Sequence, residues 1–179
     1  VGMEGASALD PSVLRGHTMI NLDSEGEGVL LAGCAGGCHM QVNLPLQRET
    51  VTGIFATLKV DGLKGGHSGT EINKGRANAN QLLGQVLTAL AEKVPYHLVT
   101  LAGGLKDNAI TREAEAQLVF ASREAAAEAE KVAAAKGKVF RENCKETDAG
   151  VTVTLTVEGE ETAAAMTAES AAKVRALLI

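Results

Sequence analysis

Aromatic residues are scarce in this sequence: Phe, Trp and Tyr make up only 2% of it, and Trp is absent. Basic residues form no block, and the net charge is -5. A nucleic-acid surface needs clustered Lys and Arg and usually aromatic side chains on which bases stack, so we expect no nucleic-acid partner. No apolar run reaches the length of a membrane span and no signal peptide opens the chain, so we expect no membrane partner either.

Cysteine is also sparse, with three in 179 residues. An odd count at low density is typical of a reducing compartment and predicts a cytoplasmic location. The length predicts one main domain that buries a core without disulfides. Because aromatics are few, that core must consist of Leu, Val, Ile and Ala. The first residue is Val, which favours a piece of a longer protein, although N-terminal processing would look the same.

The chain changes character after residue 38. Residues 1–38 are rich in Gly and have little periodicity, whereas from residue 39 the apolar residues alternate or follow helical spacing. This periodicity predicts strands at 40–46, 54–60, 96–102, 116–120 and 151–157, and helices at 68–92, 122–143 and 162–179. That order predicts an α+β fold, an antiparallel sheet with helices packed on one face. Such a sheet leaves a free edge strand, which favours pairing with a second chain.

The first motif that could bind a metal or haem is Cys34-Ala-Gly-Gly-Cys38-His39. A c-type haem site needs two residues between the cysteines, and three are present here. A structural zinc site needs a second pair of ligands, and none is evident. We therefore interpret the motif as a Gly-rich turn with two small buried thiols.

A second motif places His67 among glycines, in Gly62-Leu-Lys-Gly-Gly-His67-Ser68-Gly69, just ahead of a predicted helix. Ser68 and Glu71 have the spacing of a capping box. A His in this position is sterically accessible, and a helix N-terminus supplies positive potential for an anionic group. A solvent-facing turn histidine explains the pattern equally well, and both interpretations stay open.

Two further polar residues are candidates for a site. Asp23 ends an apolar run, where it places a carboxylate at the C-terminal end of a strand, unless it belongs to a simple Asp-Ser turn. Asn108 follows the turn at Gly103-Gly104, and its amide can bind a carboxylate or an oxyanion, unless it too is a turn residue. None of the four His is followed two residues later by Asp or Glu, and no nucleophile motif occurs. The chain thus carries no complete catalytic set.

Five short motifs occur in a fixed order: Leu22-Asp23-Ser24-Glu25; Gly33-Cys34-Ala35-Gly36-Gly37; Gly65-Gly66-His67-Ser68-Gly69; Gly75-Arg76-Ala77-Asn78-Ala79; and Asn108-Ala109-Ile110-Thr111-Arg112-Glu113. As an ordered set they resemble the aminoacylhistidine (Xaa-His) dipeptidases, which belong to the dinuclear zinc exopeptidases. The resemblance covers nearly the whole chain, and the run from Gly75 to Ala79 is its most specific part.

This resemblance implies that residues 39–179 form the lid and dimerisation domain, and that residues 1–38 are a remnant of the catalytic domain with its connection. The family's catalytic Glu-Glu pair directly precedes a Gly-Met-x-Gly-Ala segment, which here opens the chain at Gly2. The resemblance also implies two zinc ions in each active site of the full-length protein. It carries over only Asp23 as a metal ligand, and one carboxylate cannot hold zinc alone.

For the lid, the resemblance implies that His67 is the catalytic histidine that reaches the neighbouring subunit's active site and stabilises the oxyanion. It implies that Asn108 contacts the substrate. The chain departs from the family pattern at Thr111, where Pro is usual, and at Ala121, where carnosinases carry an arginine; Arg123 lies nearby. How the substrate carboxylate is bound therefore stays open.

Together these inferences predict a fragment of a zinc metallo-dipeptidase that acts as a homodimer on dipeptides of the Xaa-His type. The isolated chain is expected to be inactive and to bind no zinc, because it lacks the general base and most metal ligands. The alternative is a stand-alone α+β module for dimerisation or small-molecule binding. A Glu-Glu pair directly before Val1 in the reading frame would decide between the two.

Overall fold

The computed structural model describes all residues except 1–3, 21, 23–25, 34–37 and 39. The chain divides into two units, Val1–Val42 and Asn43–Ile179. In the first unit the structure contains a short helix α1 (Glu4–Ser7) and a 3-10 turn η1 (Pro11–Val13), which Asp10 caps by accepting the Ser12 N–H at 2.9 Å. Every described side chain of this unit is exposed, so its described residues form no core.

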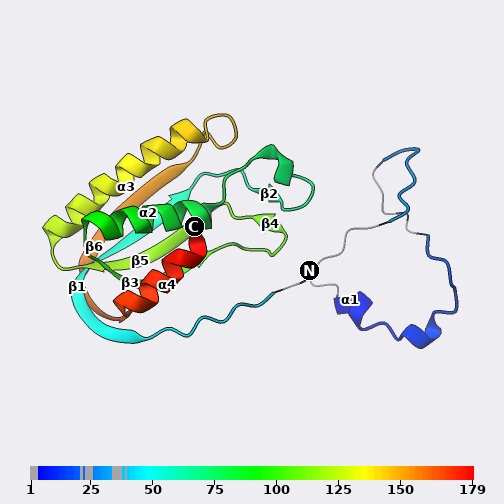
Figure 1. Ribbon diagram of the computed structural model, residues 1–179, viewed down its shortest axis with the longest axis horizontal. Coiled ribbons are helices and arrows are strands. Elements are labelled where there is room, and N and C mark those ends of the chain that lie inside the picture. Colours follow the sequence, from blue (N-terminus) through cyan, green and yellow to red (C-terminus); the bar gives the residue numbers. More distant parts are fainter. Residues whose placement is uncertain (1–3, 21, 23–25, 34–37, 39) are drawn as a thin grey trace. The chain divides into compact units, whose positions relative to one another are not determined.

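The second unit is built on a four-stranded antiparallel sheet with the order β3-β5-β1-β6. Its elements are β1 (Arg48–Asp61), β2 (Gly66–His67), η2 (Ile72–Lys74), α2 (Ala79–Lys93), β3 (His97–Gly103), β4 (Ala109–Ile110), β5 (Ala114–Phe120), α3 (Arg123–Asn143), β6 (Thr152–Met166) and α4 (Ala168–Leu178). The large strands and α2 and α3 form two interleaved β-α-β units. Figure 1 shows α2, α3 and α4 on one face of the sheet, which confirms the predicted α+β class.

The core between sheet and helices is mostly aliphatic, as the composition predicts, and Phe120 and Phe140 are buried in it as well. Leu58 and Leu118 point from the sheet toward Leu83 and Leu87 of α2, and all four are fully buried. The helix α3 contributes mainly alanines, and its Gly137 lies where an added Cβ would stand 3.2 Å from Val153 of β6. Small residues therefore let α3 pack closely against the long strand β6.

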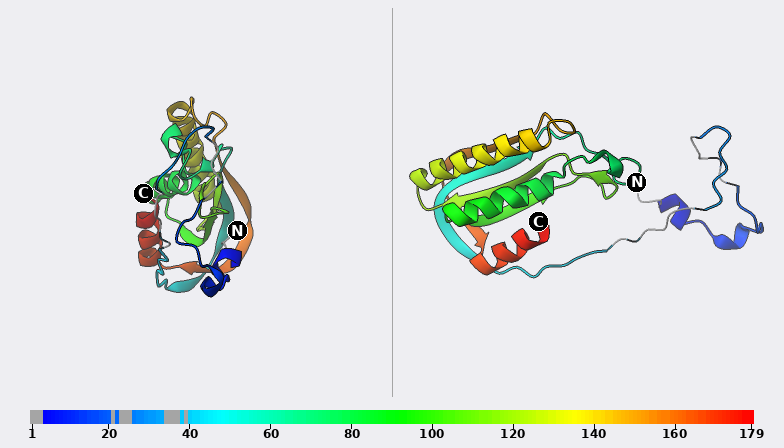
Figure 2. Two further views of the ribbon diagram at one scale, coloured as in Figure 1. Left: turned by 90° about the vertical axis from the view of Figure 1, so that its right-hand side faces the viewer. Right: turned by 45° about the horizontal axis from the view of Figure 1, so that its top comes forward.

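The strands β1 and β6 are long enough to curve beyond the rest of the sheet (Figure 2). Their register shifts between Ile54 and Ala56, which marks an irregularity of the β-bulge type. At this bend Gly53 passes so close to the Phe120 carbonyl oxygen that a Cβ would clash with it. Beyond it, the Arg48 guanidinium donates to the carbonyl oxygens of Val99 at 2.9 Å and Ala164 at 2.8 Å. This arginine ties β1 and β6 to the edge strand β3.

Two predictions made from local patterns are wrong. The alternation at 40–46 predicts a strand, yet the structure assigns these residues to no strand, and Met40 and Val42 are exposed. The helix predicted from Ser68 begins only at Ala79, where Asn78 is the cap and accepts the Asn80 N–H at 2.9 Å. The residues in between form turns and η2, which ends at Gly75 with a φ of 63°.

The predicted helix at 162–179 is wrong in its first turn. Residues 162–166 complete β6, and only the chain from Ala168 onwards is helical, with Thr167 as its cap. Ala163, Ala164 and Ala165 pair with β1 in the sheet register. Alanine favours a helix intrinsically, but pairing with a neighbouring strand outweighs so weak a preference. Within the described part of the chain, no helix is long and apolar enough to cross a membrane.

Candidate functional site

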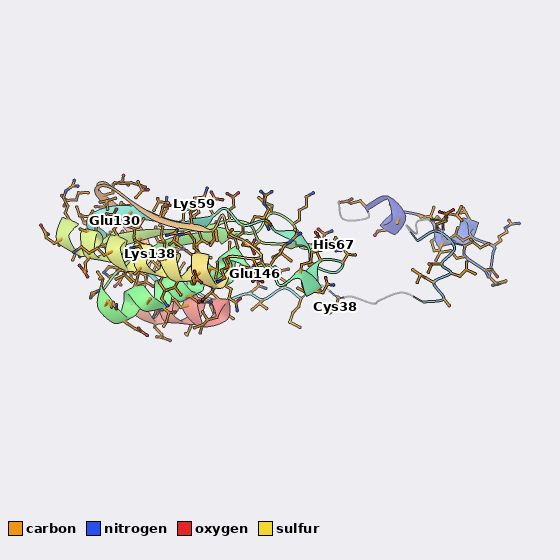
Figure 3. All side chains as sticks on the ribbon, turned by 90° about the horizontal axis from the view of Figure 1, so that it is seen from above. Cys38, Lys59, His67, Glu130, Lys138 and Glu146 are labelled. Carbon is orange, nitrogen blue, oxygen red and sulfur yellow. The ribbon has the colours of Figure 1, made fainter. Side chains whose placement is uncertain are left out.

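The two lid residues selected from the sequence, His67 and Asn108, lie together on a small ribbon. The strands β2 and β4 pair antiparallel, with Gly66 opposite Ile110 and His67 opposite Ala109. The Ser68 N–H extends the pairing by donating to the Asn108 carbonyl oxygen at 2.9 Å. The ribbon projects past one end of the main sheet (Figure 1), and Figure 3 shows His67 at the end of the unit opposite to Glu130 of α3.

The imidazole of His67 is held by backbone groups of the turn that follows it. Its Nδ1 accepts the Gly69 N–H at 3.0 Å and the Thr70 N–H at 3.3 Å. A nitrogen that accepts hydrogen bonds carries no proton, so the neutral ring has its proton on Nε2. No hydrogen bond to Nε2 occurs within the described part of the chain. His67 is exposed, and it therefore presents an N–H donor to whatever binds in front of the ribbon.

Glu71 anchors the His67 turn through both of its carboxylate oxygens. Its Oε2 accepts the His67 backbone N–H at 3.0 Å, and its Oε1 lies 2.7 Å from the Lys74 Nζ and 3.1 Å from an Arg76 nitrogen. The Lys74 ammonium, the His67 N–H and the Arg76 guanidinium lower the pKa of Glu71 to about 2. The carboxylate thus stays ionised at neutral pH. The spacing of Ser68 and Glu71 predicts a helix capping box. In the structure Glu71 instead closes a turn by accepting the His67 N–H.

Arg76 connects this turn to Gly65, the residue just before β2. Besides its contact with Glu71, it donates to the Gly65 carbonyl oxygen. Gly66 has a φ of 150°, and a Cβ there would clash with both the Arg76 guanidinium and the Glu71 carboxylate. The positive φ favours glycine at this position, and any side chain would also displace the two charged groups that pack against the backbone. No pattern in the sequence indicates these contacts: the spacing of Glu71 predicts a capping box, and Arg76 stands out only as part of the run from Gly75 to Ala79.

An open cavity of about 630 Å³ lies beside the ribbon. Its wall includes Lys106, Thr111 and Arg112 together with the backbone of Gly103 and Gly104. His67 and Asn108 do not line it, although Ala109 and Ile110 of β4 do. The cavity therefore adjoins the candidate site and does not contain it.

The positions that depart from the family pattern lie in different places. Thr111 is 9% exposed, and its carbonyl oxygen accepts the Ala79 N–H at 3.0 Å, which joins the ribbon to the first turn of α2. Ala121 and Arg123 follow β5 at the strand end remote from Thr111, and both are exposed. Neither is brought to His67 within this chain.

Other sequence candidates fall partly outside the described residues. Asp23, Cys34 and His39 lie among the residues that the structure does not describe. Cys38 is described and exposed, so the prediction of a buried thiol at this position is wrong. Among the described residues, no three His, Cys, Asp or Glu side chains gather in a way that could hold a metal ion.

Comparison with known proteins gives the family. Residues 58–148, which include β1 from Leu58, the His67 ribbon, α2 and α3, match the peptidase dimerisation domain of the M20 family. This chain belongs to the M20 peptidase dimerisation domains. The predicted resemblance to a dipeptidase lid is thereby confirmed.

The M20 dimerisation domain described here is similar to dipeptidases over most of its length. It is 46% identical over 123 residues, 68% of this chain, to the cytosol non-specific dipeptidase of Escherichia coli (strain K12). Its structure resembles the crystal structure of aminoacylhistidine dipeptidase from Vibrio alginolyticus, with a TM-score of 0.69 over 75% of this chain. The sequence identity to that protein is 25%. The match covers 25% of the first protein and 28% of the second. The chain therefore spans about a quarter of the length of these relatives.

Proposed function

We propose that this chain is the lid and dimerisation segment of a zinc-dependent dipeptidase that hydrolyses unblocked dipeptides of the Xaa-His type. The observation that carries the proposal is the exposed His67, whose Nδ1 is engaged by two backbone N–H groups so that Nε2 is the donor. The 46% identity to a dipeptidase supports the reaction class. The similarity to an aminoacylhistidine dipeptidase supports the substrate type, and the relative named as cytosolic supports a cytoplasmic location.

In this proposal His67 acts by electrostatic stabilisation. Attack of water on the peptide carbonyl places a negative charge on the carbonyl oxygen, and an N–H group fixed in position beforehand stabilises that charge. The turn 67–71 holds the ring through Gly69 and Thr70, so little reorganisation is needed at the moment of reaction. Asn108 lies beside His67 on the same ribbon, where its amide contacts the bound dipeptide.

The zinc ions would lie in the catalytic domain, with residues 1–38 as a part of that domain and of its connection to residues 39–179. When bound, zinc supplies an activated water and polarises the carbonyl group. Asp23 is the one metal ligand that this chain would contribute. A single carboxylate does not make a zinc site, so the residues of this chain do not fit the metal pair without further ligands.

The proposal includes a homodimer, which the name of the domain family supports. His67 lies at the end of its unit, on a ribbon outside the main sheet (Figure 3). A side chain in this position is free to contact another domain or another subunit. In the dimer, His67 would complete the active site of the neighbouring subunit, whose metal ligands include Asp23.

The test is complementation between two inactive variants of the full-length enzyme. His67→Ala removes the oxyanion donor and should lower kcat by about two to three orders of magnitude. Asp23→Ala should inactivate separately, through the metal. After mixing and subunit exchange, heterodimers contain one site with intact metal ligands from one subunit and an intact His67 from the other. Activity should reappear at that site.

The control is a mixture in which exchange is verified with isotope-labelled subunits and native mass spectrometry. A mixture of His67→Ala with wild type sets the activity of one intact site in each heterodimer. If subunits exchange and activity stays at the level of the single variants, His67 does not act across the dimer. Full activity of His67→Ala alone would reject its catalytic role altogether.

A further inference from the structure

A buried carboxylate, Asp148, lies in the turn between α3 and β6, and its side chain is fully inaccessible to solvent. Its Oδ1 accepts the Lys64 N–H and its Oδ2 accepts the Ala77 N–H, both at 2.9 Å. Buried carboxylates are rare unless their oxygens are satisfied. Here both oxygens receive backbone donors, and no side-chain cation contacts them within the described residues.

The two donors stand at the two ends of one loop, residues 64–77. This loop contains β2 with His67, the Glu71 turn and η2. One carboxylate thus joins the point where the chain leaves β1 to the point where it approaches α2. Long loops are held in one conformation only if such contacts offset the entropy of ordering them. Asp148 is a residue from a distant segment that binds both ends at once.

The turn that carries Asp148 is itself fixed in place. The Asp148 N–H donates to the Cys144 carbonyl oxygen at 2.7 Å, and the Val151 N–H donates to the Asp148 carbonyl oxygen at 3.0 Å. Gly62 and Gly150 approach so closely that a Cβ at Gly62 would clash with the Gly150 carbonyl oxygen. The carboxylate is therefore attached to the rigid end of α3 and the start of β6.

We propose that Asp148 is a positioning residue for His67. It fixes both ends of the loop 64–77, and the loop in turn holds the imidazole through the Glu71 turn. Asp148 contacts no substrate in this scheme; it acts through the placement of the ribbon. The catalytic part of this inference rests on the proposed function, whereas the structural part concerns this chain alone.

The first test uses this chain and the variant Asp148→Asn. The amide keeps the shape of the carboxylate, but its NH₂ group cannot accept a hydrogen bond, so one of the two backbone donors loses its partner. Amide hydrogen exchange, read by NMR, should accelerate at Lys64 or Ala77 by about ten- to a hundredfold, because a hydrogen bond to a charged group is lost. The ¹⁵N shifts of the His67 ring should move toward those of a mixture of tautomers as its turn loosens.

The matched control is Glu146→Gln, an exposed carboxyl in the same turn (Figure 3). It should change neither the exchange rates of the loop nor the His67 ring signals. In the unsubstituted chain the Lys64 and Ala77 amides should exchange as slowly as amides of the sheet, a result that does not depend on whether Asp148→Asn folds. Fast exchange at both amides in the unsubstituted chain, or an unchanged loop in Asp148→Asn, would overturn the proposal.

The second test is a double-mutant cycle in the full-length dipeptidase. Asp148→Asn should lower kcat about tenfold or more, with little effect on KM, because the misplaced donor acts in the transition state. In the His67→Ala background the same substitution should change kcat no further. An equal loss in both backgrounds would show that Asp148 supports the fold in general and does not position His67. If His67→Ala is itself fully active, the proposed function fails, while the exchange data still decide whether Asp148 holds the loop.

Discussion

The Ser68 N–H donates to the carbonyl oxygen of Asn108 at 2.9 Å, and this bond places two segments that are distant in sequence side by side. Directly next to it, His67 pairs with Ala109 in the ribbon of β2 and β4. His67 and Asn108, the two residues that the family resemblance selects, are thus neighbours on the ribbon of β2 and β4. In the proposed enzyme, a substrate in front of the ribbon would meet the His67 Nε2–H with Asn108 beside it.

We expect no peptidase activity from the isolated chain, even with zinc added. The general base and most metal ligands lie outside this sequence in the proposed enzyme, so no water can be activated here. The measurement is hydrolysis of an Xaa-His dipeptide by the purified chain with and without zinc. A chelator-sensitive rate that follows the chain through a final purification step would show that the sequence carries a complete site.

We expect the chain to self-associate through a sheet edge or an adjoining helix. The strands β3 and β6 are the edges of the main sheet, and an edge strand offers unpaired backbone groups to a second chain. Sedimentation velocity over a range of concentrations should show a concentration-dependent dimer. A weak dimer is compatible with this, because the catalytic domain adds contacts in the full-length protein. Monomer alone at the highest concentration would contradict the prediction.

We expect the contacts of the Glu71 carboxylate to persist far into the acid range. The pKa of Glu71 is lowered from 4.5 to about 2 by the Lys74 ammonium, the His67 N–H and the Arg76 guanidinium. A carboxylate with a lowered pKa contributes stability above its unfolded pKa, and the contribution is lost as pH falls through the folded pKa. The His67 amide signal should therefore titrate near pH 2 and not near 4.5.

The variant Glu71→Gln tests the same contact at neutral pH. It removes the charge and leaves an amide in place of the carboxylate, so the His67 amide should exchange faster at every pH. Glu146→Gln again serves as the control, since Glu146 is exposed and has no hydrogen bond or ion pair with the turn 67–71 within the described part of the chain. A His67 amide that titrates near 4.5 in the unsubstituted chain would show that the Glu71 contacts do not persist in solution.

We expect Asn78→Ala to destabilise the second unit by about 1 kcal/mol, the typical cost of losing an N-cap. The Asn78 side chain accepts the Asn80 N–H at the first turn of α2, a helix that buries one face against the sheet. Asn73→Ala, in the exposed turn η2, is the matched control and should be nearly neutral. Urea unfolding followed by circular dichroism measures both. Equal effects of the two substitutions would reject the capping role of Asn78.

The sequence predicted most of the sheet, because each core strand carries its own signal. The apolar residues of β1 from Ile54 and of β5 from Ala116 alternate, and one face of each strand is buried. The same logic predicted a strand at 40–46, which is no strand in the structure. It also assigned residues 162–166 to a helix, since alanine pairing with β1 leaves no local signal. The two-residue strands β2 and β4 are too short for any periodicity to reveal them.

The sequence by itself determined the class of the fold, the aliphatic core and the candidates His67 and Asn108, since these depend on residue types and their local order. Only the tertiary structure decided that the two candidates share a ribbon, that Nδ1 of His67 is occupied and that Asp148 binds both Lys64 and Ala77. These relationships join segments far apart in the chain through backbone N–H and C=O groups. Every residue but proline carries both groups, so side-chain identity does not predict which backbone groups will form hydrogen bonds with each other.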